Sequence, residues 1–549
     1  MTALGSGIRR NGGWLALIGA SAVIGTAGTL AMPVALGRTV DALVGGGDSR
    51  RWLALVVLLV VIGITCEVVD ALAGTACVAG TTARLRDRLV RHVLAAGPHR
   101  TRRFDPGDLV SRVSGNAADA AQVTVSMVSI AVATLPPVGS LVLLLLIDPV
   151  VAAAFVAGLA LVGLVLRAFT RRTVAVVGDY QRAQGRIAAR LAESLVGART
   201  IAAAGTLDQE RRRVLRPLPE LAGHGQRTWR ALARTSGEAA VVGPVVLIAV
   251  LAVGGLALVH GRISTGELLA ASRYAVIGAG LGSLTGVLGR LARARAAGRR
   301  TGEVLGTPRV DYGTAGLPVG PGRLEFDEVT VYSGQSPLLD RVRLDVPGGA
   351  TVAVVGRSGS GKSLLAALAA RLRDPDEGEV RLDGVPLPAL SHRAIRAAVG
   401  CAFERPVLVG GTVADAVGLG LDADRVRAAA QATGADDFIR RLPRGYDTPL
   451  TEAPMSGGEA QRLGLARAWP ASRVLVLDDA TSSLDVVSEL RISRTLAAEH
   501  GRRTHLVVTH RAGTAAQADQ VVWLESGRVR AVGPHRLLWT DPDYRAVFR

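Results

Sequence analysis

Six long apolar stretches constrain what this chain can fold into more than any other feature of its sequence. Each has close to the roughly 17 to 25 apolar residues that a helix needs to cross a bilayer. The stretches are Trp14–Leu36, Leu53–Ala76, Val123–Ile147, Val150–Leu166, Ala239–Val259 and Leu268–Leu288. They predict a membrane domain of six helices within residues 1–300.

The composition supports a membrane half joined to a soluble half. Over 549 residues the mean hydropathy is +0.32, with 3% aromatic and 20% charged residues, which is not typical of a soluble enzyme. The net charge of +18 would suit a nucleic-acid-binding protein. However, the arginines flank apolar spans instead of forming a basic stripe interleaved with aromatic residues. We therefore expect a lipid bilayer as a partner and no nucleic acid, and the six spans exclude a soluble nucleic-acid ATPase.

The loops between the apolar stretches alternate in length and charge. The first, third and fifth are short and poor in arginine, whereas the second and fourth are long and rich in it. By the positive-inside rule the long loops and both termini are cytoplasmic, so the chain is predicted to be a multi-pass protein of the cytoplasmic membrane.

The two long loops carry helical periodicity, over Ala83–Ala95 and Asp179–Leu195, so the spans are expected to continue into the cytoplasm as helices. Each loop has a break at its far end, at Phe104–Leu109 in the first and Gly197–Asp208 in the second. Short helices at these tips would be placed to touch a soluble domain. Ordinary turn chemistry is the alternative interpretation.

Three ionisable residues fall inside apolar stretches: Glu67 and Asp70 in the second, and Arg273 in the sixth. Ionisable groups at membrane depth are costly and usually face a cavity or one another. A role in translocating a substrate or a proton is therefore one hypothesis. A structural ion pair or a wet extracellular cleft is the other.

A phosphate-binding loop marks the soluble half. The sequence GRSGSGKS follows the apolar run Thr351–Val355, and a helix is expected over Leu364–Leu372. In this pattern backbone N–H groups cradle phosphates, Lys362 reaches the β/γ oxygens and the Ser363 hydroxyl meets Mg²⁺. Lys362 is the only lysine in the chain. The residues predicted to hold the nucleotide here are Gly356, Arg357, Ser358, Gly359, Ser360, Gly361, Lys362 and Ser363.

Two further segments complete the predicted chemistry. The strand-like run Arg473–Asp478 supplies a carboxylate for Mg²⁺ at Asp478, with Asp479 directly after it. The turn Met455–Glu459 opens a helix expected over Ala460–Trp469 and forms a second anion cradle. Since one nucleotide cannot occupy two distant cradles, this turn suggests a second nucleotide bound across a dimer.

These ordered motifs resemble those of an ATP-binding-cassette (ABC) exporter half-transporter, of the type that exports drugs, peptides or lipids. The segment GRSGSGKS resembles the Walker A loop, and VLVLD ending at Asp478 resembles the Walker B strand. Ser483–Asp485 resembles the D-loop, His510 the switch histidine and Tyr332 the adenine-stacking tyrosine. The two loop tips resemble coupling helices. The residues that match the family signature are Ser456, Gly457, Gly458 and Glu459.

The resemblance implies an all-α domain of six transmembrane helices with long cytoplasmic extensions, followed by an α/β nucleotide-binding domain. The domains would be residues 1–300, a linker over 301–320, and a cytoplasmic cassette over 321–549. The implied cofactors are ATP and Mg²⁺, with Ser363, Asp478 and Glu404 as metal ligands. The implied partners are a second half-transporter and an exported substrate.

Two departures from the family pattern affect catalysis. Asp479 stands where a glutamate normally acts as general base, and its shorter side chain would withdraw the carboxylate by roughly an ångström. Glu404 stands where a glutamine normally contacts Mg²⁺, and it adds negative charge beside the γ-phosphate. This pattern favours the degenerate member of a heterodimer. Tolerated drift in an active homodimer is the alternative.

The function predicted from the sequence is ATP-driven export across the cytoplasmic membrane, with Asp479, His510 and Glu404 as the catalytic residues. A subunit that binds ATP to regulate or gate another membrane protein, without transport of its own, is the alternative.

Overall fold

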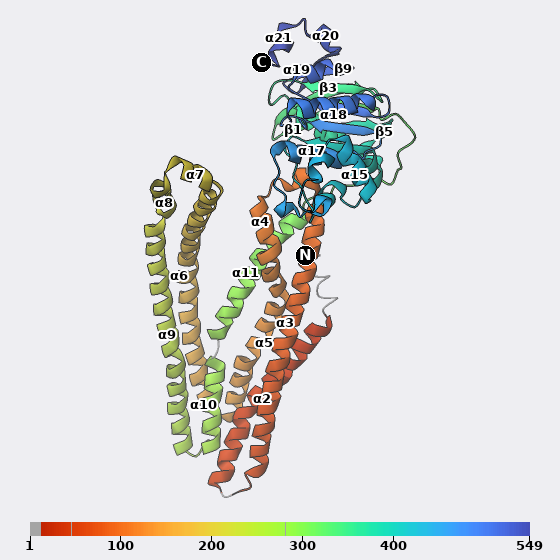
Figure 1. The fold of residues 1–549 in the computed structure, drawn as a ribbon. Coiled ribbons are helices and arrows are strands. Elements are labelled where there is room, and N and C mark those ends of the chain that lie inside the picture. Colours follow the sequence, from red (N-terminus) through yellow and green to blue (C-terminus); the bar gives the residue numbers. More distant parts are fainter. Residues whose placement is uncertain (1–11, 46, 280–281) are drawn as a thin grey trace. The chain divides into compact units, whose positions relative to one another are not determined.

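The computed structural model describes residues 12–45, 47–279 and 282–549 (Figure 1). Contacts divide the chain into two compact units, which are described separately. The first contains the chain up to Arg91 together with Asp105–Gly306, and the second contains His92–Phe104 together with Thr307–Arg549.

The first unit is helical throughout its described length. Its long helices are α2 (Gly12–Val44), α3 (Arg50–Thr101), α5 (Ala117–Ile147), α6 (Pro149–Val196), α9 (Leu218–Val259), α10 (Thr265–Ala279) and α11 (Gly282–Leu305). Short helices at the tips are α4 (Pro106–Ser111), the π-helical turn η1 (Arg112–Asn116), α7 (Ala198–Ala204) and α8 (Leu207–Leu215). Figure 1 shows α6 and α9 side by side, joined through α7 and α8.

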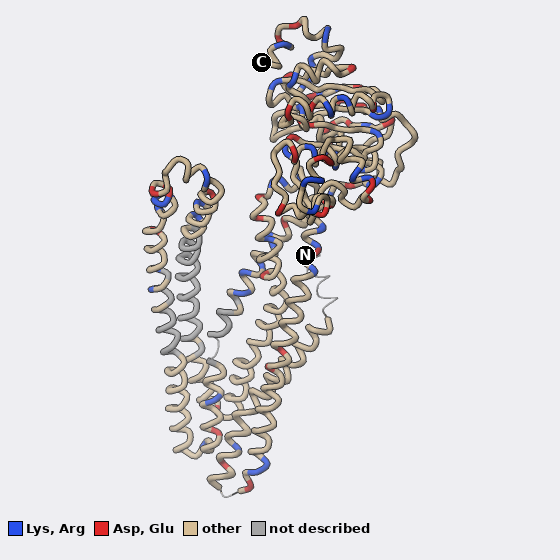
Figure 2. Tube along the Cα trace, viewed as in Figure 1, with Lys and Arg blue, Asp and Glu red and all other residues tan. Residues whose placement is uncertain are grey.

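The predicted apolar stretches lie within these helices. Among the described residues, three helical segments are long and apolar enough to cross a membrane: Gly12–Val44, Arg50–Thr101 and Pro106–Ile147. Shorter apolar helices cover Pro149–Gly158 and Gly243–Val259. The sixth predicted stretch includes residues 280 and 281, which lie outside the described residues. Figure 2 shows long uncharged runs along α2, α3 and α5.

The helical extensions predicted for the long loops are confirmed, because α3 continues through Ala83–Ala95 and α6 through Asp179–Leu195. The first extension is interrupted at Gly97, whose φ of 78° is left-handed and which precedes Pro98. After it, the Asp105 side chain caps α4 by accepting a hydrogen bond from the Gly107 amide at 2.8 Å. In the second loop, Gly205 ends α7 with a φ of 65°.

Helices α2 and α10 approach each other closely at their facing ends. A Cβ on Gly37 would lie 2.4 Å from the Gly266 carbonyl oxygen, so only glycine fits there. The Asp41 carboxylate accepts hydrogen bonds from the Gly266 amide at 2.8 Å and the Ser264 hydroxyl at 2.7 Å. Backbone contact and a carboxylate cap thus fix the start of α10 against the end of α2.

The second unit contains two sheets. The first has the strand order β2-β1-β4-β5, and the second has the order β10-β9-β3-β8-β7-β6. The strands are β1 (Leu324–Ser333), β2 (Ser336–Val346), β3 (Thr351–Val355), β4 (Glu377–Leu382), β5 (Val385–Pro386), β6 (Val399–Phe403), β7 (Val474–Asp478), β8 (Thr504–Val508), β9 (Gln520–Glu525) and β10 (Arg528–Gly533). The pairs β9–β3, β3–β8, β8–β7 and β7–β6 are parallel, and the central strands are apolar, as strands covered on both faces require.

The helices of the second unit pack against these sheets in separate apolar cores. They are α12 (Lys362–Ala369), α13 (His392–Ala398), α14 (Val413–Gly418), α15 (Ala423–Ala432), α16 (Asp436–Ile439), α17 (Gly457–Ala468), α18 (Val486–Ala498), α19 (Ala512–Ala516), α20 (His535–Leu538) and α21 (Pro542–Ala546). One core contains Leu365 and Leu368 of α12, and another contains Leu463 and Leu465 of α17.

The end of α3 belongs to the second unit because it pairs with the segment that follows α11. The buried His92 ring bonds through Nε2 to the Thr307 carbonyl oxygen at 2.8 Å and accepts at Nδ1 from Arg309 at 3.1 Å. The Val310 amide donates to the Ala95 carbonyl at 3.1 Å. The sequence gives no sign of this pairing, which joins segments more than 200 residues apart.

Candidate functional site

The phosphate-binding loop connects β3 to α12. Gly361 has a φ of 100°, and a Cβ at this position would lie 2.6 Å from Leu339 Cδ2, so the loop requires glycine there. The predicted helix Leu364–Leu372 begins two residues earlier, at Lys362, and ends at Ala369. The earlier start follows from Gly361, whose left-handed backbone turns the chain directly into α12.

Lys362 bends back over this loop. Its Nζ donates to the Gly356 carbonyl at 2.7 Å and to the Arg357 carbonyl at 3.0 Å. Burial lowers the pKa of the Lys362 ammonium, while the nearby carboxylates of Asp479 and Asp478 oppose that shift. A cation held by backbone carbonyl oxygens of the loop and near two carboxylates suits a phosphate chain with its Mg²⁺.

Strand register brings the remaining predicted residues to one edge of the sheet. In the parallel pairing, Asp478 at the end of β7 lies opposite Phe403 of β6 and Val508 of β8. The residues that follow these strand ends therefore share that edge: Glu404 after β6, Asp479 after β7, and Thr509 with His510 after β8. Ligand sites of open parallel sheets lie at this carboxyl edge.

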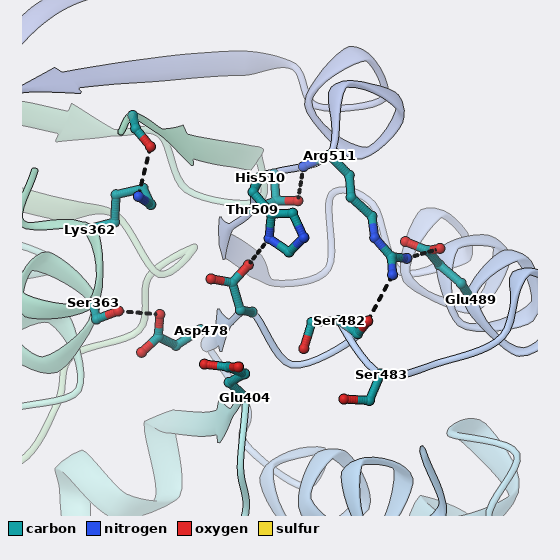
Figure 3. Close-up of polar contacts among 12 residues, drawn as sticks. Lys362, Ser363, Glu404, Asp478, Ser482, Ser483, Glu489, Thr509, His510 and Arg511 are labelled. Atoms are coloured by element: carbon teal, nitrogen blue, oxygen red, sulfur yellow. Dashed lines mark hydrogen bonds and ion pairs between the residues drawn. The ribbon is translucent and has the colours of Figure 1, made fainter. Parts of the chain in front are cut away.

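The Walker B carboxylate pairs with the phosphate-loop serine. The Ser363 hydroxyl donates to Asp478 Oδ1 at 2.9 Å (Figure 3). Burial raises the pKa of the Asp478 carboxyl, and the nearby carboxylates of Asp479 and Glu404 raise it further. The hydrogen bond from Ser363 lowers this pKa and so opposes the shift. A hydroxyl and a carboxylate so arranged fit Mg²⁺, which takes few protein ligands and completes its shell with water and phosphate oxygens. In the described part of the chain, no three His, Cys, Asp or Glu side chains are grouped to hold a metal unaided.

Asp479 and His510 contact each other directly. His510 Nδ1 lies 3.0 Å from Asp479 Oδ1 (Figure 3). Asp479 has a φ of 48°, a left-handed conformation that aspartate tolerates better than most residues. Its amide donates to the Val508 carbonyl at 3.2 Å, which fixes the turn after β7.

Glu404 lies at the same edge with its side chain 55% exposed, 3.8 Å from the Arg405 guanidinium. Its carboxylate is free to turn toward a ligand, since an exposed ion pair of this length holds it weakly. Its backbone carbonyl is held more firmly, because it accepts from Gln461 Nε2 at 2.7 Å.

The signature turn forms the start of α17. The Ser456 hydroxyl accepts from the Glu459 amide at 3.2 Å, and Glu459 Oε2 accepts from the Ser456 amide at 2.8 Å, which makes a capping box. The Ser456 amide and the Ser456 hydroxyl, at 2.9 Å, both donate to Glu459 Oε2, and these two hydrogen bonds lower the pKa of the Glu459 carboxyl. Because α17 and α12 pack into different cores, the two anion cradles lie on different parts of the unit.

Tyr332 lies near the end of β1. Its amide donates to Asp376 at 2.7 Å, its hydroxyl donates to Glu377 at 3.1 Å, and that second bond raises the pKa of the phenol. The β1–β2 hairpin also carries Leu339, which meets Gly361 of the phosphate loop. The hairpin therefore brings Tyr332 to the side of the unit where the loop lies.

Sequence reasoning missed Gln461 and Arg511. Gln461 is 2% exposed and contacts both Glu404 and the segment after Asp479, and Arg511 contacts that same segment. Leu465 follows Gln461 by four residues and shares its face of α17, so a polar residue on an apolar helix face was the available sequence signal for Gln461.

A helical domain with membrane-length apolar helices, joined to a parallel-sheet domain with a phosphate loop, defines a membrane-bound ATPase. Comparisons with known proteins agree with this class. The profile of the ABC transporter transmembrane region matches residues 15–278, and the ABC transporter profile matches residues 339–482. The chain belongs to the ABC transporter family, as an exporter half-transporter whose ATPase is coupled to transport.

Relatives cover most of the chain. The ABC transporter ATP-binding protein RamA of Streptomyces coelicolor is 49% identical over 524 residues, covering 94% of this chain and 82% of RamA. An ATP-dependent lipid A-core flippase of Chromobacterium violaceum is 32% identical, covering 79% of this chain and 76% of the flippase. A solved structure of a bacterial Atm1-family ABC exporter with ATP bound is 24% identical, covers 98% of both chains and has a TM-score of 0.83, so the fold is shared.

Proposed function

We propose that this chain is the catalytically degenerate half of a heterodimeric exporter in the cytoplasmic membrane. Two cassettes would close on two ATP molecules, and the helical tips would pass that closure to the membrane helices. The chain's own site would hydrolyse ATP slowly, while Ser456–Glu459 would serve the partner's site.

One observation carries the proposal: the carboxylate after the Walker B strand is an aspartate already paired with His510 at 3.0 Å. An aspartate is one methylene shorter than a glutamate, and a displacement of about 1 Å can cost roughly 10²-fold in rate. The residues proposed to hold the nucleotide and Mg²⁺, Lys362, Ser363 and Asp478, are all of the expected type. Binding is therefore retained in this proposal while proton abstraction from water is weakened.

Mg²⁺ belongs to the proposal as the ion that bridges the phosphates. Ser363 and Asp478 would hold it directly, and Glu404 would contact it by turning its exposed side chain. The added charge of Glu404 would oppose the negative charge that develops during phosphoryl transfer, which again favours slow turnover.

The test measures ATP binding and hydrolysis by the purified full chain. Wild type should bind MgATP and turn it over slowly, and Asp479→Glu should raise hydrolysis, because the longer side chain restores the reach of the base. The left-handed backbone at Asp479 suits glutamate less well, so the melting temperature is measured alongside. High activity in wild type that is unchanged by Asp479→Glu and abolished by Asp479→Asn would contradict the degenerate site.

A gating subunit without transport of its own is the second candidate. It is favoured by one relative, the mitochondrial potassium channel ATP-binding subunit of Xenopus tropicalis, which is 34% identical over 410 residues. The chain covers 58% of that protein's length. ATP-dependent uptake of substrate into inverted vesicles that contain this chain and its partner separates the two functions, because a gating subunit alone moves no substrate.

A further inference from the structure

The buried amide of Gln461 joins three segments around the ATP site. Its Nε2 donates to the Glu404 carbonyl at 2.7 Å and to the Ser482 hydroxyl at 3.0 Å, and its Oε1 accepts from the Ser483 amide at 2.9 Å. Both N–H groups and the carbonyl oxygen are therefore engaged. The orientation is unambiguous, because a backbone carbonyl can only accept and a backbone N–H can only donate.

A second side chain, that of Arg511, holds the same segment. Arg511 donates from Nη2 to the Ser482 carbonyl at 2.9 Å and pairs through Nη1 with Glu489 of α18. Figure 3 shows Arg511 reaching the segment that carries Ser482, next to His510. Ser482 is thus fixed through its side chain by Gln461 and through its backbone by Arg511.

Ser482 and Ser483 belong to the segment that begins at Asp479, the proposed base. Ser482 follows Asp479 by three residues, and its amide donates to the Asp479 carbonyl at 3.1 Å. Any movement of Ser482–Ser483 therefore moves the turn that carries the Asp479 carboxylate. Gln461 also links this turn to Glu404, the residue that follows the neighbouring strand β6.

Gln461 additionally ties the turn to the signature helix. It lies five residues after Ser456 on α17, about 7.5 Å along the helix axis. A force on the N-terminus of α17 reaches Gln461 through continuous helix, and Gln461 passes it to Ser482, Ser483 and the Glu404 backbone.

We propose that Gln461 is a positioning residue for ATP hydrolysis. Arg511 supports it by holding Ser482, which both residues contact. Gln461 holds Asp479 and Glu404 in register with each other and couples both to the end of α17 that would serve the partner's site. The inference rests on the proposed roles of Asp479, Glu404 and the signature turn, but the hydrogen bonds that define it are independent of those roles.

The principal variants are Gln461→Met and Gln461→Glu in the full-length chain. Methionine keeps the length of the side chain but removes all three hydrogen bonds. An ionised glutamate keeps an acceptor for the Ser483 amide but loses both donated bonds. The matched control is Gln431→Met on α15, where the side chain is exposed.

Hydrogen exchange followed by mass spectrometry gives a readout that does not require turnover. Gln461→Met should speed exchange over residues 479–486 and 402–406 and leave β3 and β8 protected as in wild type, because the loss is local. Uniformly faster exchange across the unit would show that Gln461 has a packing role only. Unchanged exchange would show that its hydrogen bonds do not hold residues 479–486 in place. Either result overturns the proposal.

Kinetics supply the second readout. Gln461→Met should lower kcat by roughly 10- to 100-fold with little change in KM, because the nucleotide-binding loop is untouched. Arg511→Lys should lower kcat less, and the double variant should lose less than the product of the two single losses, since both act on Ser482. Equal changes in kcat and KM, or fully multiplicative losses, overturn the proposal.

These outcomes separate the inference from the degenerate-site proposal. If Asp479→Glu leaves hydrolysis unchanged, the degenerate-site proposal is contradicted. The exchange experiment on Gln461→Met still tests the positioning role of Gln461 independently.

Discussion

Lys362 is the residue on which we expect nucleotide binding to depend most directly. It is the only lysine in the chain, and its ammonium lies over the loop whose backbone would cradle the phosphates. A compact ammonium differs from the planar guanidinium used everywhere else among the basic residues. Position 362 therefore combines a requirement for charge with a requirement for shape.

Lys362→Ala should abolish ATP binding at the chain's own site, because it removes the charge that balances the β/γ-phosphates. Lys362→Arg keeps the charge and serves as the matched variant; it should also bind poorly, since the larger group does not fit the narrow loop. Photolabelling with an ATP analogue measures both. Labelling of Lys362→Ala at the wild-type level would show that the nucleotide binds elsewhere.

His505 is a buried residue that makes stability depend on pH. It is 0% exposed in β8, with Nδ1 at 3.3 Å from the Thr351 hydroxyl and no hydrogen bond to Nε2 among the described residues. Burial lowers the pKa of His505 to about 4, with further lowering by Arg503 and His500 and an opposing effect of Asp519. The folded protein therefore holds this imidazole neutral over most of the acidic range.

The unfolding free energy should fall as pH decreases from about 6.5 to about 4, because the unfolded chain protonates His505 in that window and the folded chain does not. The loss is on the order of 3 kcal/mol at the acidic end, and His505 contributes no pH dependence above neutrality. Melting temperatures of wild type and His505→Leu at pH 7.5 and pH 5 measure it. An equal acid-induced decrease in both proteins would exclude His505 as the cause.

At the scale of elements, the start of α17 is separate from the strand ends that carry the proposed site for this chain's own nucleotide. The capping box of Ser456 and Glu459 starts α17. The apolar face of α17 packs in a different core from the apolar face of α12. An exposed helix N-terminus with a fixed turn is suited to an anion supplied by another molecule.

Ser456→Ala should lower hydrolysis at the partner's site while leaving ATP binding at this chain's own site intact. Loss of an N-cap costs roughly 1 kcal/mol, so a control for stability is needed. Thr412→Ala removes the equivalent capping box from α14 and should not affect hydrolysis. Photolabelling measures ATP binding at the chain's own site, which contains Lys362. If Ser456→Ala lowers that binding as much as it lowers hydrolysis at the partner's site, action across the dimer is contradicted.

At the scale of the whole molecule, the two carboxyl groups inside α3 are candidates for lining the translocation pathway. Glu67 is exposed in the isolated chain, and Asp70 Oδ1 is buried with no hydrogen bond among the described residues. A carboxylate facing lipid is costly, so Glu67 is expected to face water or a partner in the dimer.

Glu67→Cys, in a background without Cys66, Cys77 and Cys401, should react with a water-soluble thiol reagent in at least one nucleotide state. Leu72→Cys is the matched control, because Leu72 is 67% exposed on the same helix but apolar and expected to meet lipid. Labelling in membrane vesicles with and without MgATP measures both. Protection of Glu67→Cys in every state would place it in a buried structural contact.

The sequence by itself determined the class of this protein, because the features that define the class are local. Apolar stretches of membrane length, the contiguous phosphate loop and the turn Met455–Glu459 each depend on residues close together in the chain. The helical extensions of α3 and α6 were predictable for the same reason, since a 3.6-residue period is a local property.

Only the tertiary structure decided how distant residues meet. The parallel register of β6, β7 and β8 brings Glu404, Asp479 and His510 to one edge, and no local pattern specifies that register. The pairing of Ala95 with Val310 places the end of α3 in the second unit, which the sequence division at residues 300 and 320 does not anticipate. The three hydrogen bonds of Gln461 likewise depend on contacts across 21 to 57 residues, which are fixed by packing of the whole unit.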